Sequence, residues 1–263
     1  MSIISRPVIS SEAMVLRVWS YAETSVIASL LTEKTGFVKV IAKGARKSKS
    51  NLQSLVQPGT LVDVEFTDVA NRELQYLRGG SVQLDSSSNN LTLEKTSYLL
   101  AIVEIIDRCK PSGKDVDLFH LCRRFVKVLM SLPEAVTASA YYRFQLELMN
   151  MQGIAPVLDK CSNCQEIMSK TLNSNCFFSY SSGGVVCSSC VCGDSPGRFL
   201  TPQVYLNLCT LSEYGIDNET STTRFVDRET GIVLHRFLEY YLPEYRLPTA
   251  LDMLNICKVN SGS

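Results

Sequence analysis

The chain has 263 residues, 45% of them hydrophobic, and its 26 lysines and arginines balance 26 aspartates and glutamates. No apolar run approaches the 18 residues of a membrane helix, which argues against a membrane protein and indicates two or three small globular domains. Residues 1–10 lack the apolar core of a secretory signal, so we expect the chain in a reducing cytoplasm, where thiols persist.

Residues 1–80 have the pattern of an all-β domain. Short runs of alternating apolar and polar residues are separated by turn signals such as Thr35-Gly36 and Pro58-Gly59. Five such runs suggest a five-stranded barrel of the OB type, a fold that commonly binds nucleic acid through its open face and loops. The runs are Ala13 to Trp19, Ser25 to Leu31, Phe37 to Lys43, Leu61 to Phe66 and Leu74 to Leu77.

The positive charge of this domain is concentrated in one stretch, because residues 34–62 contain no acidic residue. The two-residue period of the third run places Lys39 and Lys43 on one face, and residues 44–51 indicate a mobile loop. Such a loop suits a polyanion, since cationic groups neutralise phosphates without a fixed base sequence. The alternative is a solvated loop that only keeps the protein soluble. The residues expected to contact phosphate are Lys39, Lys43, Arg46, Lys47 and Lys49.

Three aromatic residues of the barrel are candidates for stacking on bases: Trp19, Tyr21 and Phe37. We nevertheless expect each of them in the barrel core. Tyr21 is the strongest stacking candidate because it follows a strand.

From residue 91 onward, apolar residues recur at the three- and four-residue spacing of helices. A later helix begins with Thr201 as cap and Pro202 in the first turn. We expect a helical domain in two parts, residues 81–155 and 196–263. Its apolar stripes run from Tyr98 to Cys109, Leu118 to Leu129 and Tyr142 to Met149, and its final helix spans about Ile232 to Tyr241.

Two Cys-x-x-Cys pairs lie between these parts, in a module that we place at residues 156–195: Cys161 with Cys164, and Cys187 with Cys190. Two residues between paired cysteines let one tight turn aim both sulfurs at a single ion, so two such turns complete the tetrahedral shell of Zn²⁺. A closed four-thiolate site is structural, because catalytic zinc keeps an exchangeable position.

Other readings of these cysteines stay open. A Cys-x-x-Cys motif also serves as a redox pair, although such a pair normally occurs once, at the start of a helix. Cys176 and Cys192 lie inside or beside the module and are alternative ligands, and Cys192 competes for the fourth position because it follows Cys190 by two residues.

The sequence does not predict an enzyme. Only His120 and His235 supply imidazole groups, and each lies in a helical stripe. The chain has no Gly-x-x-x-x-Gly-Lys phosphate loop and no His-Glu-x-x-His pair. We therefore expect a protein without catalytic activity.

Several stretches resemble the RecO family of bacterial recombination mediators. Residues 153–164 (GIAPVLDKCSNC), then Phe178-Ser179 and residues 183–190 (GGVVCSSC), are similar to the zinc region of that family. Residues 42–50 (AKGARKSKS) resemble its basic stretch after the third barrel strand, and Met14 to Leu16 resemble its first strand. The resemblance covers nearly the whole chain, in the order barrel, helices, zinc insert, helices.

This resemblance implies a DNA repair factor of the RecF pathway in the bacterial cytoplasm, associated with the nucleoid. Such proteins bind single- and double-stranded DNA, anneal complementary strands, engage single-stranded-DNA-binding protein and work with RecR to load RecA. By this reading the five basic residues contact phosphate and the four paired cysteines hold zinc. Many members carry a second basic stretch after the last tyrosine-rich helix. Here residues 245–250 keep only Arg246, so a second DNA surface is not expected there.

Two other functions fit the same residues. A zinc-bearing adaptor would use the basic loop for acidic protein partners and would lack salt-sensitive affinity for DNA. An RNA-binding barrel is the closer alternative, since a loop that contacts phosphate does not distinguish the two sugars.

Overall fold

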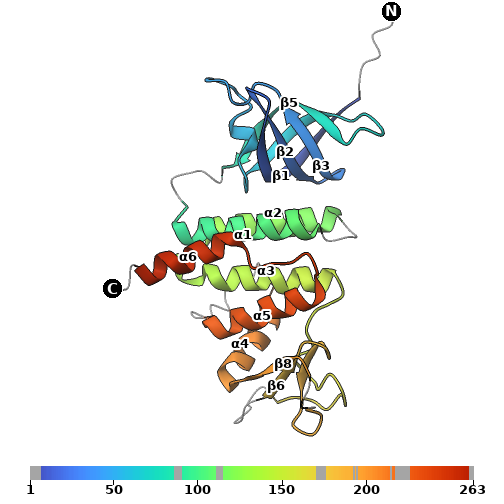
Figure 1. The fold of residues 1–263 in the computed structure, drawn as a ribbon, viewed down its shortest axis with the longest axis vertical. Coiled ribbons are helices and arrows are strands. Elements are labelled where there is room, and N and C mark those ends of the chain that lie inside the picture. The colour runs from blue at the N-terminus through green and yellow to red at the C-terminus, as the bar shows by residue number, and fades with distance from the viewer. Residues whose placement is uncertain are drawn as a thin grey trace, which may run out of the picture. The chain divides into compact units, whose positions relative to one another are not determined.

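The computed structural model describes residues 7–85, 91–110, 115–169, 176–191, 193, 195–213, 215–216 and 226–260. The chain forms two compact units, which we call the barrel unit (residues 1–130 and 248–263) and the cysteine unit (residues 131–247). Figure 1 follows their elements in chain order from the blue strands to the red helix α6. None of the described helices is long and apolar enough to cross a lipid bilayer.

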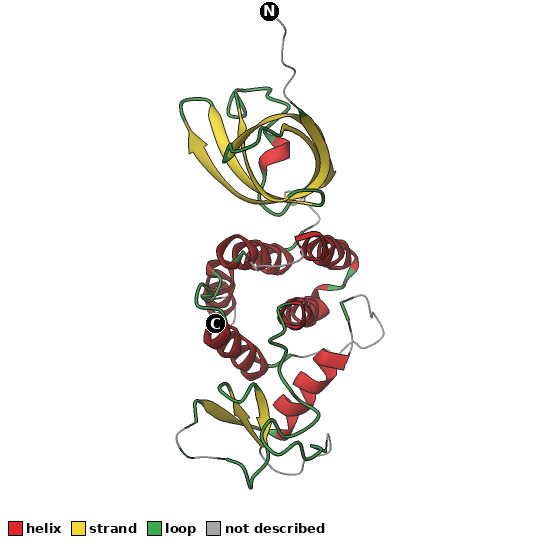
Figure 2. Cartoon of the chain, turned by 90° about the vertical axis from the view of Figure 1, so that its right-hand side faces the viewer, coloured by secondary structure: helices red, strands yellow, loops and turns green. Residues whose placement is uncertain are grey.

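A closed five-stranded barrel forms the N-terminal part of the barrel unit, which confirms the predicted fold class. The strand order is β1-β2-β3-β5-β4, closed by β1 against β4, and only the β3–β5 pair is parallel. Figure 2 shows the strands closing into a ring. The elements are β1 (Val8–Tyr21), β2 (Ser25–Thr32), β3 (Gly36–Ala42), the 3-10 helix η1 (Ser54–Val56), β4 (Leu61–Thr67) and β5 (Leu74–Leu84).

The barrel core consists of side chains that alternate along each strand, as the period of a strand requires. Val15, Val40 and Val64 are fully buried within it, and Leu55 and Val56 of η1 belong to the same cluster. The outward side chains of β3, including Lys39, therefore lie on the opposite face from Val38, Val40 and Ala42.

Three helices complete the barrel unit: α1 (Leu93–Cys109), α2 (Asp115–Ser131) and α6 (Thr249–Asn260). Thr92 caps α1 by accepting a hydrogen bond from the Lys95 N–H at 3.3 Å. Helix α6 follows the helix that the sequence predicts as the last one. Its first N–H, that of Thr249, donates to the Glu104 carboxylate on α1 at 2.9 Å.

The cysteine unit contains the 3-10 helix η2 (Glu134–Val136), helices α3 (Thr137–Met151), α4 (Pro202–Glu213) and α5 (Arg228–Tyr241), and a three-stranded sheet of order β7-β6-β8. Helix α4 begins as the sequence predicts, since the Val204 N–H donates to the Thr201 hydroxyl at 3.3 Å. The strands are β6 (Cys176–Ser179), β7 (Gly184–Val186) and β8 (Gly197–Leu200).

Candidate nucleic-acid interface and metal centre

The basic loop, residues 44–51, follows β3 through consecutive turns. The Lys47 N–H donates to the Gly44 carbonyl at 3.0 Å, and the Arg46 N–H donates to the Thr24 carbonyl at 2.9 Å. Ala45 is 1% exposed and belongs to the barrel core. The sequence predicts a mobile loop here, and the described backbone shows that one buried residue and one long-range hydrogen bond attach its first half to the barrel.

The five cations predicted to contact phosphate are all exposed to solvent. Lys39 and Lys43 lie on the outer side of β3 and at its end, and the other three follow on the basic loop. Within the described part of the chain, no carboxylate oxygen lies within 4.0 Å of any of these five groups. Cations without acidic partners keep their charge available for an external anion.

Tyr76 and Arg72 join this surface, although no sequence signal singled them out. The Lys43 ammonium lies 4.6 Å from the centroid of the Tyr76 ring, and the Arg72 guanidinium carbon lies 5.2 Å from the same centroid. The parallel β3–β5 pairing, in which Ile41 is opposite Tyr76, brings these distant positions together. Gln75 fixes the turn that carries Arg72, because its amide donates to the Arg72 carbonyl at 2.9 Å.

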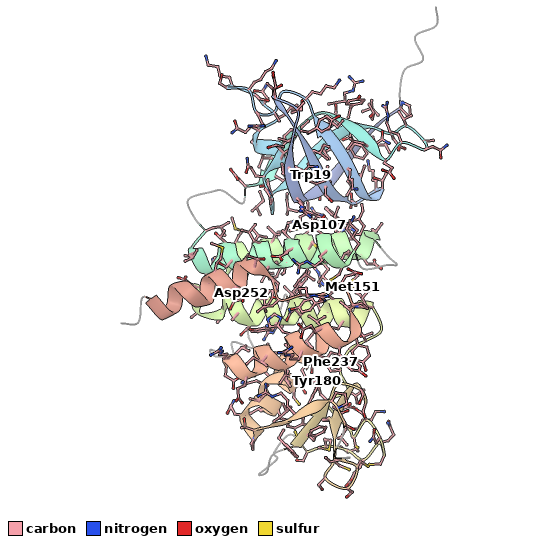
Figure 3. All side chains as sticks on the ribbon, in the orientation of Figure 1. Trp19, Asp107, Met151, Tyr180, Phe237 and Asp252 are labelled. Atoms are coloured by element: carbon pink, nitrogen blue, oxygen red, sulfur yellow. The ribbon has the colours of Figure 1, made fainter. Side chains whose placement is uncertain are left out.

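The expectation that Trp19 and Tyr21 belong to the barrel core is wrong. Their side chains are 36% and 48% exposed, and Phe37 is half-buried. The reason is a β-bulge between Val15 and Arg17, which adds one residue to β1 and reverses its alternation. Strict alternation from Val15 would place Trp19 and Tyr21 inside, but beyond the bulge they face outward. Trp19 is labelled on the barrel in Figure 3.

The four paired cysteines of the cysteine unit converge. Their sulfurs all lie within 4.8 Å of one another, and those of Cys164 and Cys187 are 3.7 Å apart. Zn–S bonds of about 2.3 Å in a tetrahedron place the sulfurs about 3.8 Å apart, so this set fits Zn²⁺. Figure 3 shows the side chains of this small sheet region with sulfur in yellow.

The backbone around Cys161 prepares its sulfur for a cation. The Cys187 N–H donates to this sulfur at 3.3 Å. Burial opposes ionisation of the Cys161 thiol, but N–H groups of Cys164, Cys187 and Asn163 outweigh it and lower the pKa of the thiol to about 6. A thiolate is the form that binds a metal, so Cys161 is prepared for a cation at neutral pH, whereas contacts with Cys187 and Cys164 raise the pKa of the Cys190 thiol.

Of the two alternative zinc ligands, Cys176 and Cys192, only Cys176 lies within the described residues. Cys176 is buried at the start of β6 and does not belong to the convergent set, and burial raises the pKa of its thiol to about 11. Cys192 lies outside the described residues. A small apolar cluster that includes Phe177 and Val186 surrounds the module, where Cys161 itself is fully buried.

Comparison with known proteins covers both units. Residues 6–83 match the family model described as Recombination protein O N terminal, and residues 90–250 match Recombination protein O C terminal. The DNA repair protein RecO of Clostridium acetobutylicum is 27% identical over 259 residues, which cover 94% of this chain and 97% of that protein. The protein of the same name from Desulfosudis oleivorans is 29% identical over 187 residues, covering 70% and 72% respectively.

Proposed function

Because this chain belongs to the RecO family of DNA repair and recombination proteins, we propose that it binds single- and double-stranded DNA and anneals complementary strands. We further propose that it acts with RecR to help load RecA onto strands covered by single-stranded-DNA-binding protein. We propose that the protein acts in the bacterial cytoplasm, in association with the nucleoid. The partner proteins are proposed from the family alone.

One observation carries the DNA-binding part of the proposal. Five exposed cations follow one another along β3 and the basic loop, and no carboxylate pairs with them among the described residues. Such a row can neutralise successive phosphates and release their counterions, which supplies affinity without base recognition. We propose Lys39, Lys43, Arg46, Lys47 and Lys49 as these contacts.

Annealing requires no bond-making group. Two complementary strands repel each other through their phosphates, and a protein that neutralises one strand lowers that repulsion when the second approaches. The proposed role is therefore a binding role, and we assign no catalytic residue.

We propose that Cys161, Cys164, Cys187 and Cys190 hold a structural Zn²⁺. The match between the observed sulfur spacing and a tetrahedral thiolate shell supports this assignment. The metal would link the turn at residues 161–164 with the turn at 187–190.

The test is fluorescence anisotropy of labelled single-stranded DNA, double-stranded DNA and single-stranded RNA across a salt series, followed by annealing of two labelled complementary strands. We expect DNA affinity that falls steeply with salt and accelerated annealing. Tighter binding to RNA would favour the RNA-binding alternative. Absence of binding at low salt would favour the protein adaptor.

A further inference from the structure

The outer face of the barrel carries a row of apolar and aromatic side chains that crosses four strands. The strand registers place Trp19 opposite Ile27, Ile27 opposite Ile41, and Ile41 opposite Tyr76. Residues paired in this way point to the same side of a sheet. The row therefore runs from β1 through β2 and β3 to β5, with an aromatic ring at each end.

The two ends of this row are accessible, whereas its middle is closed to solvent. Ile27 and Ile41 are 8% and 7% exposed, whereas Trp19 at one end is 36% exposed and Tyr76 at the other is half-buried. Three interstrand spacings of about 4.8 Å separate the two ends, or about 14 Å. The two rings, and not the isoleucines between them, are therefore the side chains open to stacking by bases.

Cations border the Tyr76 end of the row. Lys43 and Arg72 lie over the Tyr76 ring, and Lys39 stands one row further along β3, opposite Leu74. A hollow of about 400 Å³ opens beside it, lined by Phe37, Lys39, Arg72 and Lys110 and by the carboxylates of Asp68 and Glu73. Three cations against two carboxylates leave this edge positive.

We propose that Trp19 and Tyr76, the two rings at the ends of this row, are stacking sites for unpaired bases of single-stranded DNA, whose phosphates follow Lys39, Lys43 and the basic loop. This inference rests on the proposed function and deepens it. Every base presents a π-face, so stacking does not require a base sequence, and Lys43 and Arg72 can hold a phosphate beside a base that lies on Tyr76.

Affinity for DNA and preference for the single strand would then come from different residues. Phosphates are present on both single and double strands, but only unpaired bases expose their faces. The cations then supply affinity for either form of DNA, and the two rings supply preference for the single strand.

Trp19 reports on this surface directly, because it is the only tryptophan of the chain. We would titrate the full-length protein with an oligothymidylate and with an abasic strand of equal length, and record tryptophan emission. Quenching by oligothymidylate alone is expected. Equal responses to the two strands, or no response although both bind, would overturn the proposal.

A matched pair of variants gives a second measurement. Tyr76→Leu keeps an apolar side chain over Ile41 but removes the ring, and should weaken single-strand binding by roughly 5- to 150-fold while the salt slope and duplex affinity stay unchanged. Tyr240→Leu removes an exposed ring from α5 in the cysteine unit and should change nothing. If the wild type binds in a salt-dependent manner and Tyr76→Leu binds equally well, stacking fails but the proposed function stands. If the wild type does not bind DNA, the proposed function itself fails.

Discussion

Gly184 and Val157 lie so close that no side chain fits between them. A Cβ atom on Gly184 would overlap the Val157 carbonyl oxygen and lie 2.7 Å from the Val157 nitrogen. The contact accompanies two hydrogen bonds, from the Val157 N–H to the Gly183 carbonyl and from the Val185 N–H to the Val157 carbonyl, both 2.9 Å. These bonds join β7 to the segment that leads into Cys161.

Gly184→Ala should therefore destabilise the cysteine unit, by roughly 1 to 3 kcal/mol, because the two backbones must separate to admit the methyl group. Urea unfolding at fixed zinc concentration measures the effect. Gly193→Ala is the control, since a Cβ there meets no heavy atom within 4 Å. Equal unfolding midpoints for the two variants would contradict the prediction.

Replacing Cys161 and Cys164 together with serine should lower the zinc content of the purified protein and expose residues around the module to protease, because structural zinc binding is coupled to folding. Metal analysis per protein chain provides the first readout. Cys109→Ser changes a cysteine of α1 that is not in the convergent set and should retain the wild-type zinc content. Zinc that persists in the double variant would refute the assignment.

Replacing Arg46, Lys47 and Lys49 with alanine should weaken binding to all DNA sequences alike. Each lost phosphate contact on a single strand lowers the slope of log affinity against log salt by about 0.7, so three lost contacts lower it by about 2. A control with Lys127, Lys160 and Arg228 changed to alanine removes the same charge from other helices and loops. Should both triple variants lose affinity equally, net charge rather than the basic loop would account for binding.

His235 makes the cysteine unit sensitive to acid. It forms a hydrogen bond with the Tyr245 hydroxyl, and the rings of Tyr141 and Tyr142 lie nearby. Burial lowers the pKa of His235 from 6.5 to about 4. In the unfolded chain the group takes up its proton at higher pH than in the folded chain, so acidification favours unfolding. The stabilising effect is complete above about pH 6.5 and is lost as pH falls toward 4.

The free energy of unfolding measured in urea should therefore be about 1.4 kcal/mol higher at pH 7.5 than at pH 5.5 through His235. His235→Gln should reduce that difference. His120→Gln removes the other histidine, which is partly exposed near Glu33, and should leave the difference unchanged. A wild-type stability that is flat across this range would contradict the prediction.

Local patterns in the sequence were sufficient for the barrel and the cysteine site. Alternation identified five strands, although β1 and β5 extend to Val8–Tyr21 and Leu74–Leu84, beyond the predicted runs. The spacing within each Cys-x-x-Cys pair predicted four sulfurs that do converge. The alternation within a strand and the spacing within a cysteine pair both depend on residues that are close together in the chain, so both can be read from the sequence.

Features that depend on distant pairing were not predictable in this way. The bulge near Leu16 turns Trp19 outward, and the alternation of apolar and polar residues along β1 does not indicate the extra residue. Tyr76 meets Lys43 only because β3 and β5 are parallel neighbours. Helix α6 was missed because its apolar residues do not form a clear stripe, and its N-terminus is held by Glu104 from another helix.

The division of the chain has a consequence for how the barrel unit is made. Its residues come from both ends, 1–130 and 248–263, so the whole cysteine unit is synthesised before the last helix exists. Until then α1 lacks its contact with α6, and the Glu104 carboxylate lacks the Thr249 N–H. A fragment that stops after the first two helices is thus an incomplete folding unit. The free energy of unfolding of such a fragment would be lower than that of the same barrel in the full chain.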